Sequence, residues 1–397
     1  MKTSGSKLQK KTKRKNKCKR LLSGILCAAL TITAFSGSSF AQQGEAKAEG
    51  KTLSSPRIVP DSSMNAGQKV TWDCIWFGSY PQAEVIPASE EYAALSKSLI
   101  QEGDLIKDDG LYQKLQSATA WDGQGDIVID GAKYRRIKEE DATYNSTSTG
   151  YYNWKNATDY HYFKYQPIKW RVLSVNGSEA MLLADKALDD KRYHTVYENV
   201  TWEGCTMRSW LNGYGASANI QNQDYSSNNF LDTAFGTSAQ SAIKETAVEN
   251  KDNLSYGTDG GNDTKDKVFL LSESEVYTDT AKKYGFVSDY STDDEARRAK
   301  SSVFAKAMGT YFSTSDDYVG NCWWWLRSPG GRSFHAADVD DDGWVYRNYY
   351  DVDGIRDGMR PALNLNLTAS SDAASSNLWS YAGTVCSDGT SGGKWGR

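Results

Sequence analysis

Histidine and closely spaced cysteine are scarce in this sequence. Its 397 residues include three histidines, His161, His194 and His335, which stand far apart, and its cysteines form no CxxC pair. Zinc sites usually combine Cys and His at short spacings, so the sequence gives a zinc site little support. Beyond residue 41 there is also no long apolar run, whereas a membrane-spanning helix needs about 20 apolar residues. We therefore expect no transmembrane segment in the rest of the chain.

The N-terminus has no acidic residue and is strongly basic. The first twenty residues carry ten Lys or Arg, residues 21–36 form an apolar run, and residues 39–41 (SFA) offer a small-x-small cleavage site. This order is typical of a bacterial signal peptide, predicted over residues 1–41. We expect a secreted or cell-surface bacterial protein, in contact with a membrane only if the signal peptide is not cleaved.

Basic residues are in deficit once the signal peptide is removed. Ten of the 46 Lys and Arg lie in it, so 36 remain against 50 Asp and Glu, a net charge of −14. Nucleic acids bind through cationic side chains that neutralise phosphates. The sequence therefore predicts no nucleic-acid partner.

The remaining chain is predicted to hold one mixed domain. Residues 42–67 are polar and predict a flexible linker, residues 68–367 form the domain with an insertion at about 87–165, and residues 368–397 are a Ser/Gly-rich tail. A strand is expected over residues 70–80, closed by Pro81, and a hairpin over 169–184 with its turn at Asn176-Gly177.

Three capping boxes predict helix starts in the second half of the domain: Thr237 with Gln240, Ser272 with Glu275, and Thr292 with Glu295. Residues 268–271 are predicted to form a short buried strand. Short strands with a few helices indicate the α+β class.

Five ordered blocks resemble those of a bacterial domain-of-unknown-function family: 77–82 (FGSYPQ), 168–173 (IKWRVL), 201–212 (TWEGCTMRSWLN), 324–330 (WWLRSPG) and 359–363 (MRPAL). That family looks related to the C-type-lectin-like fold of formylglycine-generating enzymes and of the variable ligand-binding proteins of retroelements. The resemblance implies an α+β, C-type-lectin-like domain of short mixed strands. It also implies that residues 324–330 and 355–363 bracket a surface segment.

The bracketed segment, residues 333–357, has the composition of a recognition surface. It holds seven Asp and three Tyr, and side chains of these types supply contact area and directional hydrogen bonds. In the retroelement systems such segments are hypervariable. The ligand-binding residues expected here are Ser333, His335, Asp338, Asp340, Trp344, Tyr346, Asn348, Tyr349, Tyr350, Asp351 and Asp353.

A weak calcium site is a second hypothesis for the same segment. Asp338, Asp340, Asp342 and Gly343 match the opening D-x-D-x-D-G of a calcium loop, in which alternating carboxylates converge on the ion. The twelfth loop position is Tyr349, which cannot chelate. Apart from this candidate, no cofactor and no metal ligand are predicted.

An enzyme related to formylglycine-generating oxidases is the alternative that the resemblance keeps open, with Cys322 near the corresponding copper-binding region. Four cysteines follow the signal peptide and permit three pairings. The environment outside a cell favours oxidation, and Cys205 with Cys322 is the pairing we expect. We predict no catalytic residue and a non-catalytic protein that binds an unknown extracellular protein or glycan. A structural cell-surface component is a further alternative.

Overall fold

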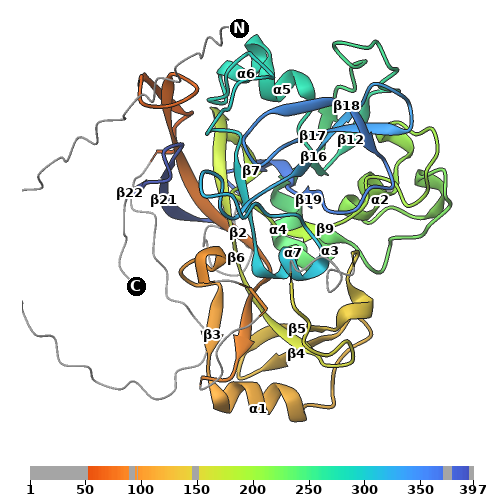
Figure 1. Cartoon of the computed structure of the whole chain (residues 1–397). Helices are drawn as coiled ribbons and strands as arrows, with labels where there is room; N and C mark the ends of the chain where they lie inside the picture. Colours follow the sequence, from red (N-terminus) through yellow and green to blue (C-terminus); the bar gives the residue numbers. More distant parts are fainter. Residues whose placement is uncertain (1–51, 89–93, 96, 145–151, 370–377, 393–397) are drawn as a thin grey trace, which may run out of the picture. The chain divides into compact units, whose positions relative to one another are not determined.

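A computed structural model describes residues 52–88, 94–95, 97–144, 152–369 and 378–392. The chain folds as a mixed α+β protein in which strands predominate and the helices are short (Figure 1). The predicted signal peptide, residues 1–41, lies outside the described residues. Within the part that the structure describes, none of the helices has the length and apolar character needed to traverse a bilayer.

The largest sheet has twelve strands, and its two longest members lie side by side at its centre. Its central path is β10 (Ile243–Lys244), β20 (Ala362–Asn366), β7 (Glu179–Ala184), β6 (His161–Asn176), β2 (Gln68–Ile86), β21 (Ser380–Cys386) and β22 (Ser391–Gly392). The strands that join it off this path are β1 (Arg57–Pro60), β3 (Leu105–Lys107), β4 (Asp126–Ile129), β5 (Ala132–Ile137) and β13 (Val268–Phe269).

The strand expected to close at Pro81 continues to Ile86. The pairing of β2 with β6 shifts register between Trp76 and Ser79 and again between Pro81 and Ala83. Gly78 supplies a positive φ of 68° at the first irregularity. Because an irregular pairing omits ladder hydrogen bonds locally, it accommodates a proline that cannot donate one, and the strand runs on.

The second sheet has five strands and contains the bracketed segment. Its order is β18 (Val345–Asp351), β17 (His335–Val339), β16 (Trp324–Pro329), β19 (Gly358–Met359) and β9 (Asp189–Asp190). Two smaller sheets pair β11 (Thr246–Val248) with β12 (Thr264–Asp266), and β15 (Asn321–Cys322) with β14 (Ala299–Ser301) and β8 (Lys186–Ala187).

The helices cover the sheets in short pieces. They are α1 (Asp109–Ser117), α2 (Thr206–Asn212), α3 (Phe230–Ala234), α4 (Thr237–Ala242), α5 (Glu273–Tyr277), α6 (Asp279–Lys282) and α7 (Val303–Met308), with single 3-10 turns η1 (Lys97–Leu99), η2 (Glu139–Asp141), η3 (Trp202–Gly204) and η4 (Ala216–Ala218).

One of the three predicted capping boxes is present. Ser272 and Glu275 cap α5 reciprocally, as predicted. Helix α4 begins at Thr237, but Gly236 is its N-cap and no side chain caps it. Thr292 starts no helix, because the Asp294 carboxylate accepts from the backbone N–H groups of Val287 and Ala296 and holds this stretch as a loop.

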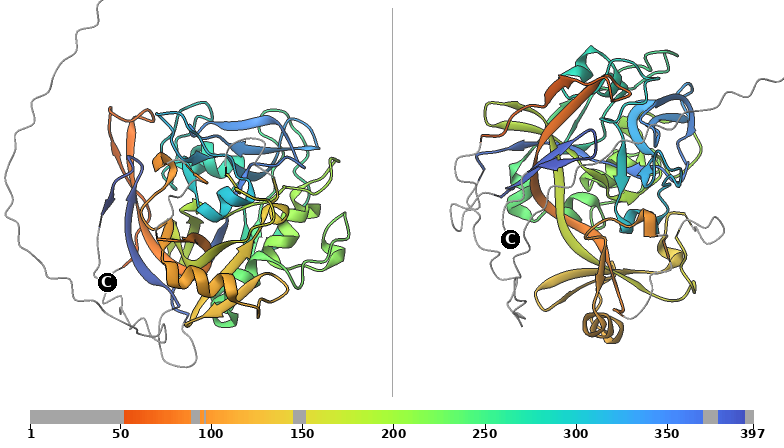
Figure 2. Two further views of the ribbon diagram at one scale, coloured as in Figure 1. Left: turned by 60° about the horizontal axis from the view of Figure 1, so that its bottom comes forward. Right: turned by 60° about the vertical axis from the view of Figure 1, so that its left-hand side comes forward.

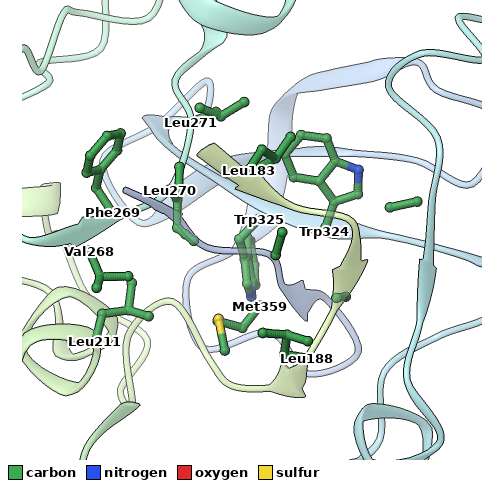
Figure 3. Packing of buried hydrophobic residues seen from close by; sticks show 14 of the residues in the cluster. Leu183, Leu188, Leu211, Val268, Phe269, Leu270, Leu271, Trp324, Trp325 and Met359 are labelled. Carbon is green, nitrogen blue, oxygen red and sulfur yellow. The ribbon is translucent and has the colours of Figure 1, made fainter. Parts of the chain in front are cut away.

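The core lies between the two sheets and the helices beside them. Trp324 of β16, Leu183 of β7, Met359 of β19 and Leu270 after β13 come together there with no exposed surface (Figure 3). In register, Trp324 is opposite Val339, which is opposite Val345, and all three are buried. One face of the five-stranded sheet thus packs on the core.

The insertion is a compact elaboration of the long strands. Helix α1, β4 and β5 gather around the ends of β2 and β6 away from the five-stranded sheet (Figures 1 and 2). They bury a small cluster of their own built on Val85, Leu115, Tyr134 and Tyr162. Residues 105–137 contain a helix and three strands, and two of these strands, β4 and β5, form a hairpin.

The chain is ordered beyond both predicted boundaries of the domain. Leu53 is buried and β1 pairs with β2, so residues 52–67 are not a flexible linker. Strand β21 pairs along the other edge of β2, so part of the Ser/Gly-rich tail belongs to the main sheet. Strand β1 forms a hairpin with the adjacent start of β2, whereas the partner of β21 lies near the other end of the chain.

Candidate functional site

The candidate site is the hairpin of β17 and β18, whose outer strand is irregular. Ala336 pairs with Tyr350 and Asp338 pairs with Tyr346, so two residues of β17 span four of β18. Residues three apart normally point to opposite faces of a strand. The bulge brings Tyr346 and Tyr349 together instead, with ring centroids 6.1 Å apart in an edge-on arrangement.

The bulge is held by hydrogen bonds from outside the strand. The Asn348 carbonyl accepts from Gly331 N at 2.7 Å and faces His335 Nδ1 at 2.8 Å. The Arg347 carbonyl accepts from Asn253 Nδ2 at 3.0 Å, and this amide also donates to Pro329 O. These contacts use the backbone groups that an edge strand would otherwise offer to another chain.

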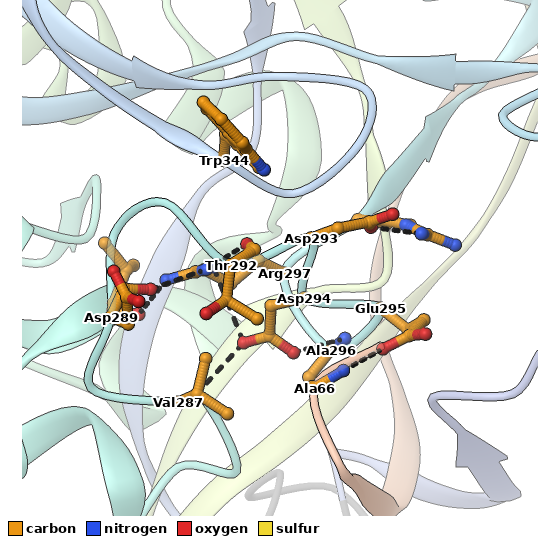
Figure 4. Close-up of polar contacts among 12 residues, drawn as sticks. Ala66, Val287, Asp289, Thr292, Asp293, Asp294, Glu295, Ala296, Arg297 and Trp344 are labelled. Atoms are coloured by element: carbon orange, nitrogen blue, oxygen red, sulfur yellow. Dashed lines mark hydrogen bonds and ion pairs between the residues drawn. The ribbon is translucent and has the colours of Figure 1, made fainter. Parts of the chain in front are cut away.

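The tip of the hairpin rests on the loop of residues 287–297. A Cβ added at Gly343, whose φ is 93°, would lie 2.3 Å from Asp294 O, so only glycine fits this approach. Val345 N donates to Tyr290 O at 2.9 Å. The loop beneath is a hydrogen-bonded network around Arg297 and Asp294, and Trp344 stands beside it (Figure 4). The tip is therefore fixed to the scaffold.

Three aromatic side chains of the hairpin are exposed. Trp344 is 42% exposed, Tyr346 37% and Tyr349 62%. The guanidinium group of Arg347 turns away from them and stacks on the ring of Tyr290, 3.3 Å from its centroid. We call Trp344, Tyr346 and Tyr349 the aromatic face.

The other predicted contact residues divide into exposed and structural ones. Asp351 is exposed, and Asp340, Asn348 and Asp353 are half-buried. Ser333 donates to Asn199 Oδ1 at 2.7 Å and borders a hollow of about 630 Å³ next to the hairpin.

Three of the predicted contact residues are buried or held by neighbouring groups in the structure. Asp338 is buried, with 1% of its surface exposed. His335 is held between the Asn348 carbonyl and the Asp351 carboxylate, whose Oδ1 is 3.3 Å from Nε2. Tyr350 packs edge-on against Trp325 with centroids 5.3 Å apart.

Asp338 belongs to a group of buried carboxylates. Asp190, Asp338 and Asp357 come from β9, from β17 and from the residue before β19 in the same sheet, and each is at most 1% exposed. Neither oxygen of Asp338 has a hydrogen-bond partner among the described residues, whereas Tyr350 lies against the carboxyl group of Asp357 and the backbone of Arg356 against that of Asp190. Sequence reasoning missed Asp190 and Asp357, because only strand pairing brings them near Asp338.

Burial and mutual repulsion raise the pKa values of these carboxyl groups. Burial raises the pKa of Asp338 well above its ordinary value, and Asp357 and Asp340 add to the rise. Burial likewise raises the pKa of Asp357, helped by Asp190 and Asp340 and opposed by Tyr350 and Arg356. The pKa of Asp340 rises to about 7 through burial and the neighbouring Asp342 and Asp341.

The calcium-loop arrangement is not formed. Asp340 and Gly343 close a hairpin turn, with Gly343 N donating to Asp340 O at 3.0 Å, and Asp342 Oδ1 accepts from Trp344 N. No three His, Cys, Asp or Glu side chains in the described ranges are placed to hold a metal ion together. The β-turn therefore keeps the three alternating carboxylates from converging on one ion.

The expected disulfide is also absent. Cys74, Cys205, Cys322 and Cys386 are all free thiols. Cys205 caps the N-terminus of α2, while Cys322 lies in β15 of a different sheet. Burial raises the pKa of both thiols to about 12, so they are protonated at neutral pH and poor ligands or nucleophiles. This environment does not favour the oxidase alternative.

Two buried arginines attach the bracketing strands to the scaffold. Arg327 donates to Leu270 O at 2.7 Å and to Glu249 O at 3.0 Å. Arg360 donates to Ala184 O at 2.9 Å and to Arg297 O at 3.2 Å. The recognition segment thus lies between two rigidly held strands.

A polar cleft of about 410 Å³ lies elsewhere, between the insertion and α2, α3 and α7. Lys191 and Trp210 line one wall and Arg136 and Tyr160 the other. No residue of the segment 333–357 lines it.

These features define an α+β protein with an edge hairpin that presents aromatic side chains. Residues 177–367 match a protein family described as "Domain of unknown function (DUF6273)". This range contains the bracketed segment and three of the five blocks, whereas residues 77–82 and 168–173 precede it. No curated protein and no solved structure matches the chain.

Proposed function

We propose that this is an exported, non-catalytic recognition protein that binds an extracellular protein or glycan through the aromatic face. The observation that carries the proposal is the exposure of three large aromatic rings on one pinned hairpin. Exposed aromatic groups of this kind mark interaction sites, because they bury much apolar area at a small entropy cost.

The contacts that fix the hairpin favour a preformed recognition surface over a mobile loop. Hydrogen bonds to Asn253, Gly331 and Tyr290 hold the strand, and Gly343 packs on backbone at the tip. A preorganised surface loses little entropy on binding. Export, the C-type-lectin-like fold and diversification by a retroelement belong to the same proposal, and they rest on the N-terminal pattern and on the resemblance.

Glycan and peptide arrays probed with the purified protein test the proposal. A bound probe should lose about tenfold or more in affinity on Trp344→Ala and on the double change Tyr346→Ala/Tyr349→Ala, as for aromatic anchors at other interfaces. Trp76→Ala is the matched control, because Trp76 is 39% exposed on β2 of the other sheet. Unchanged affinity in the aromatic variants, or no bound probe on either array, would contradict the proposal.

Diversification has a separate test, the sequencing of this gene across a natural bacterial population. Substitutions clustered at exposed positions of residues 333–357, with residues 324–330 and 359–363 intact, are expected. A flat substitution profile along the gene would leave a recognition protein with a fixed ligand and would remove the retroelement.

A further inference from the structure

One row of the five-stranded sheet places a carboxylate between two aromatic rings. Trp325 of β16 pairs with Asp338 of β17, which pairs with Tyr346 of β18. Side chains of directly opposed residues lie on the same face of a sheet. Asp338 is therefore flanked by the rings of Trp325 and Tyr346, and Tyr346 belongs to the aromatic face.

Among the described residues, no cationic side chain acts on the carboxyl groups of Asp338 and Asp340, whereas Arg356 lies near Asp357. Both oxygens of buried Asp338 lack a hydrogen-bond partner in the described part of the chain. Asp340 lies close to the phenol of Tyr346, whose pKa it raises. The arginines of the segment are engaged nearby: Arg347 contacts Ser255 and Tyr290, and Arg356 lies over the ring of Tyr144.

Burial raises the pKa values of Asp338 and Asp340, and a cation beside them restores the charged form of these carboxyl groups. The surroundings select the kind of cation. The described residues offer no three-ligand group for a metal ion. They do offer Asp338 and Asp340 next to the rings of Tyr346 and Tyr349. Carboxylates beside aromatic faces suit an organic cation, which gains both ion pairing and cation–π attraction.

We propose that the hairpin binds an alkylammonium group of its ligand at Asp340 and Asp338, beside the rings of Tyr346 and Tyr349. The inference rests on the proposed function and names the chemistry of the partner. The half-buried Asp340 meets the ammonium group first, and displacement of the Tyr346 ring gives it access to Asp338. The partner is a lysine-bearing protein segment or a polyamine.

Calorimetric titration of the full protein with hexalysine and with spermidine at low ionic strength tests this. Both probes carry alkylammonium groups, and binding should weaken by about tenfold or more in Asp340→Asn and in Asp338→Asn, because a charge-assisted contact is lost. Asp316→Asn is the control, since Asp316 is an exposed aspartate outside the hairpin and outside the predicted contact residues. Hexalysine binding without spermidine binding identifies a protein segment, and binding of both identifies the ammonium group itself as the determinant.

Two results would overturn the inference. One is the absence of binding by either probe, and the other is equal weakening by Asp316→Asn, which would indicate general attraction to a negative surface. Asp340 is half-buried, so Asp340→Asn tests the site even if Asp338→Asn does not fold. A neutral ligand that depends on Trp344 and Tyr349 but not on Asp340 would refute the ammonium site and leave the proposed function intact.

Discussion

Arg327 gives the sharpest test of how the recognition segment is anchored. The side chain is 4% exposed, and it donates to Leu270 O, to Glu249 O and, at 2.5 Å, to Glu275 Oε2. Methionine has a similar length and no donor, so Arg327→Met keeps much of the packing and removes the hydrogen bonds. The carbonyls of Leu270 and Glu249 then each lose a charged donor, which lowers the free energy of unfolding by about 1–3 kcal/mol per carbonyl. Glu275 retains its contacts with Ser272, so it adds less.

The expected loss in the free energy of unfolding is about 3–5 kcal/mol, the range found when one partner of a buried charged pair is removed. Urea denaturation followed by tryptophan fluorescence measures it, with an unchanged m value as the sign that the unfolded state is the same. Arg332→Met is the control, because Arg332 is exposed just before the same segment, and it should change stability by less than about 0.5 kcal/mol. A loss below about 1 kcal/mol in Arg327→Met would refute the anchoring argument.

Three further predictions concern the hairpin, the response to pH and the tail. Gly343→Ala should lower the free energy of unfolding, measured by urea denaturation, by about 2–4 kcal/mol, because this position combines a positive φ with contact to Asp294 O. Gly389→Ala is the control: this glycine also has a positive φ but open space around it, so the loss should be about 1 kcal/mol. Equal costs would show that the tip does not pack tightly. Burial raises the pKa of Glu273 from 4.5 to about 7, so the folded state retains a proton that the unfolded state releases, and stability should fall by about 3 kcal/mol as pH rises through this window. Glu273→Gln should remove this fall in stability, measured by thermal unfolding at a series of pH values. An unchanged pH dependence in Glu273→Gln would contradict the role of Glu273. Deleting residues 378–397 uncovers the edge of β2 and should lower the melting temperature and promote association, measured by light scattering; a monomer of unchanged stability would contradict this.

Sequence patterns correctly predicted the features that depend on residues close together in the chain. The hairpin of β6 and β7 formed as expected, although its two-residue loop is Gly177-Ser178 and only Gly177 has a positive φ. The capping box at Ser272 formed because both of its partners lie within one turn. Thr292 and Glu295 have the same spacing, but Asp294 binds the backbone of its own loop, and that competition cannot be seen in the motif.

The sequence by itself determined the strand-rich α+β class, the bracketing strands and the aromatic composition of the segment between them. Only the tertiary structure decided which of those side chains are exposed, since the bulge in β18 joins Tyr346 to Tyr349 and turns Tyr350 inward. It also decided that β21 is a strand of the main sheet, and that Asp190, Asp338 and Asp357 share one buried region. The physical reason is the same in each case: register and pairing join residues that lie far apart in the chain, and a local pattern carries no information about its distant partner.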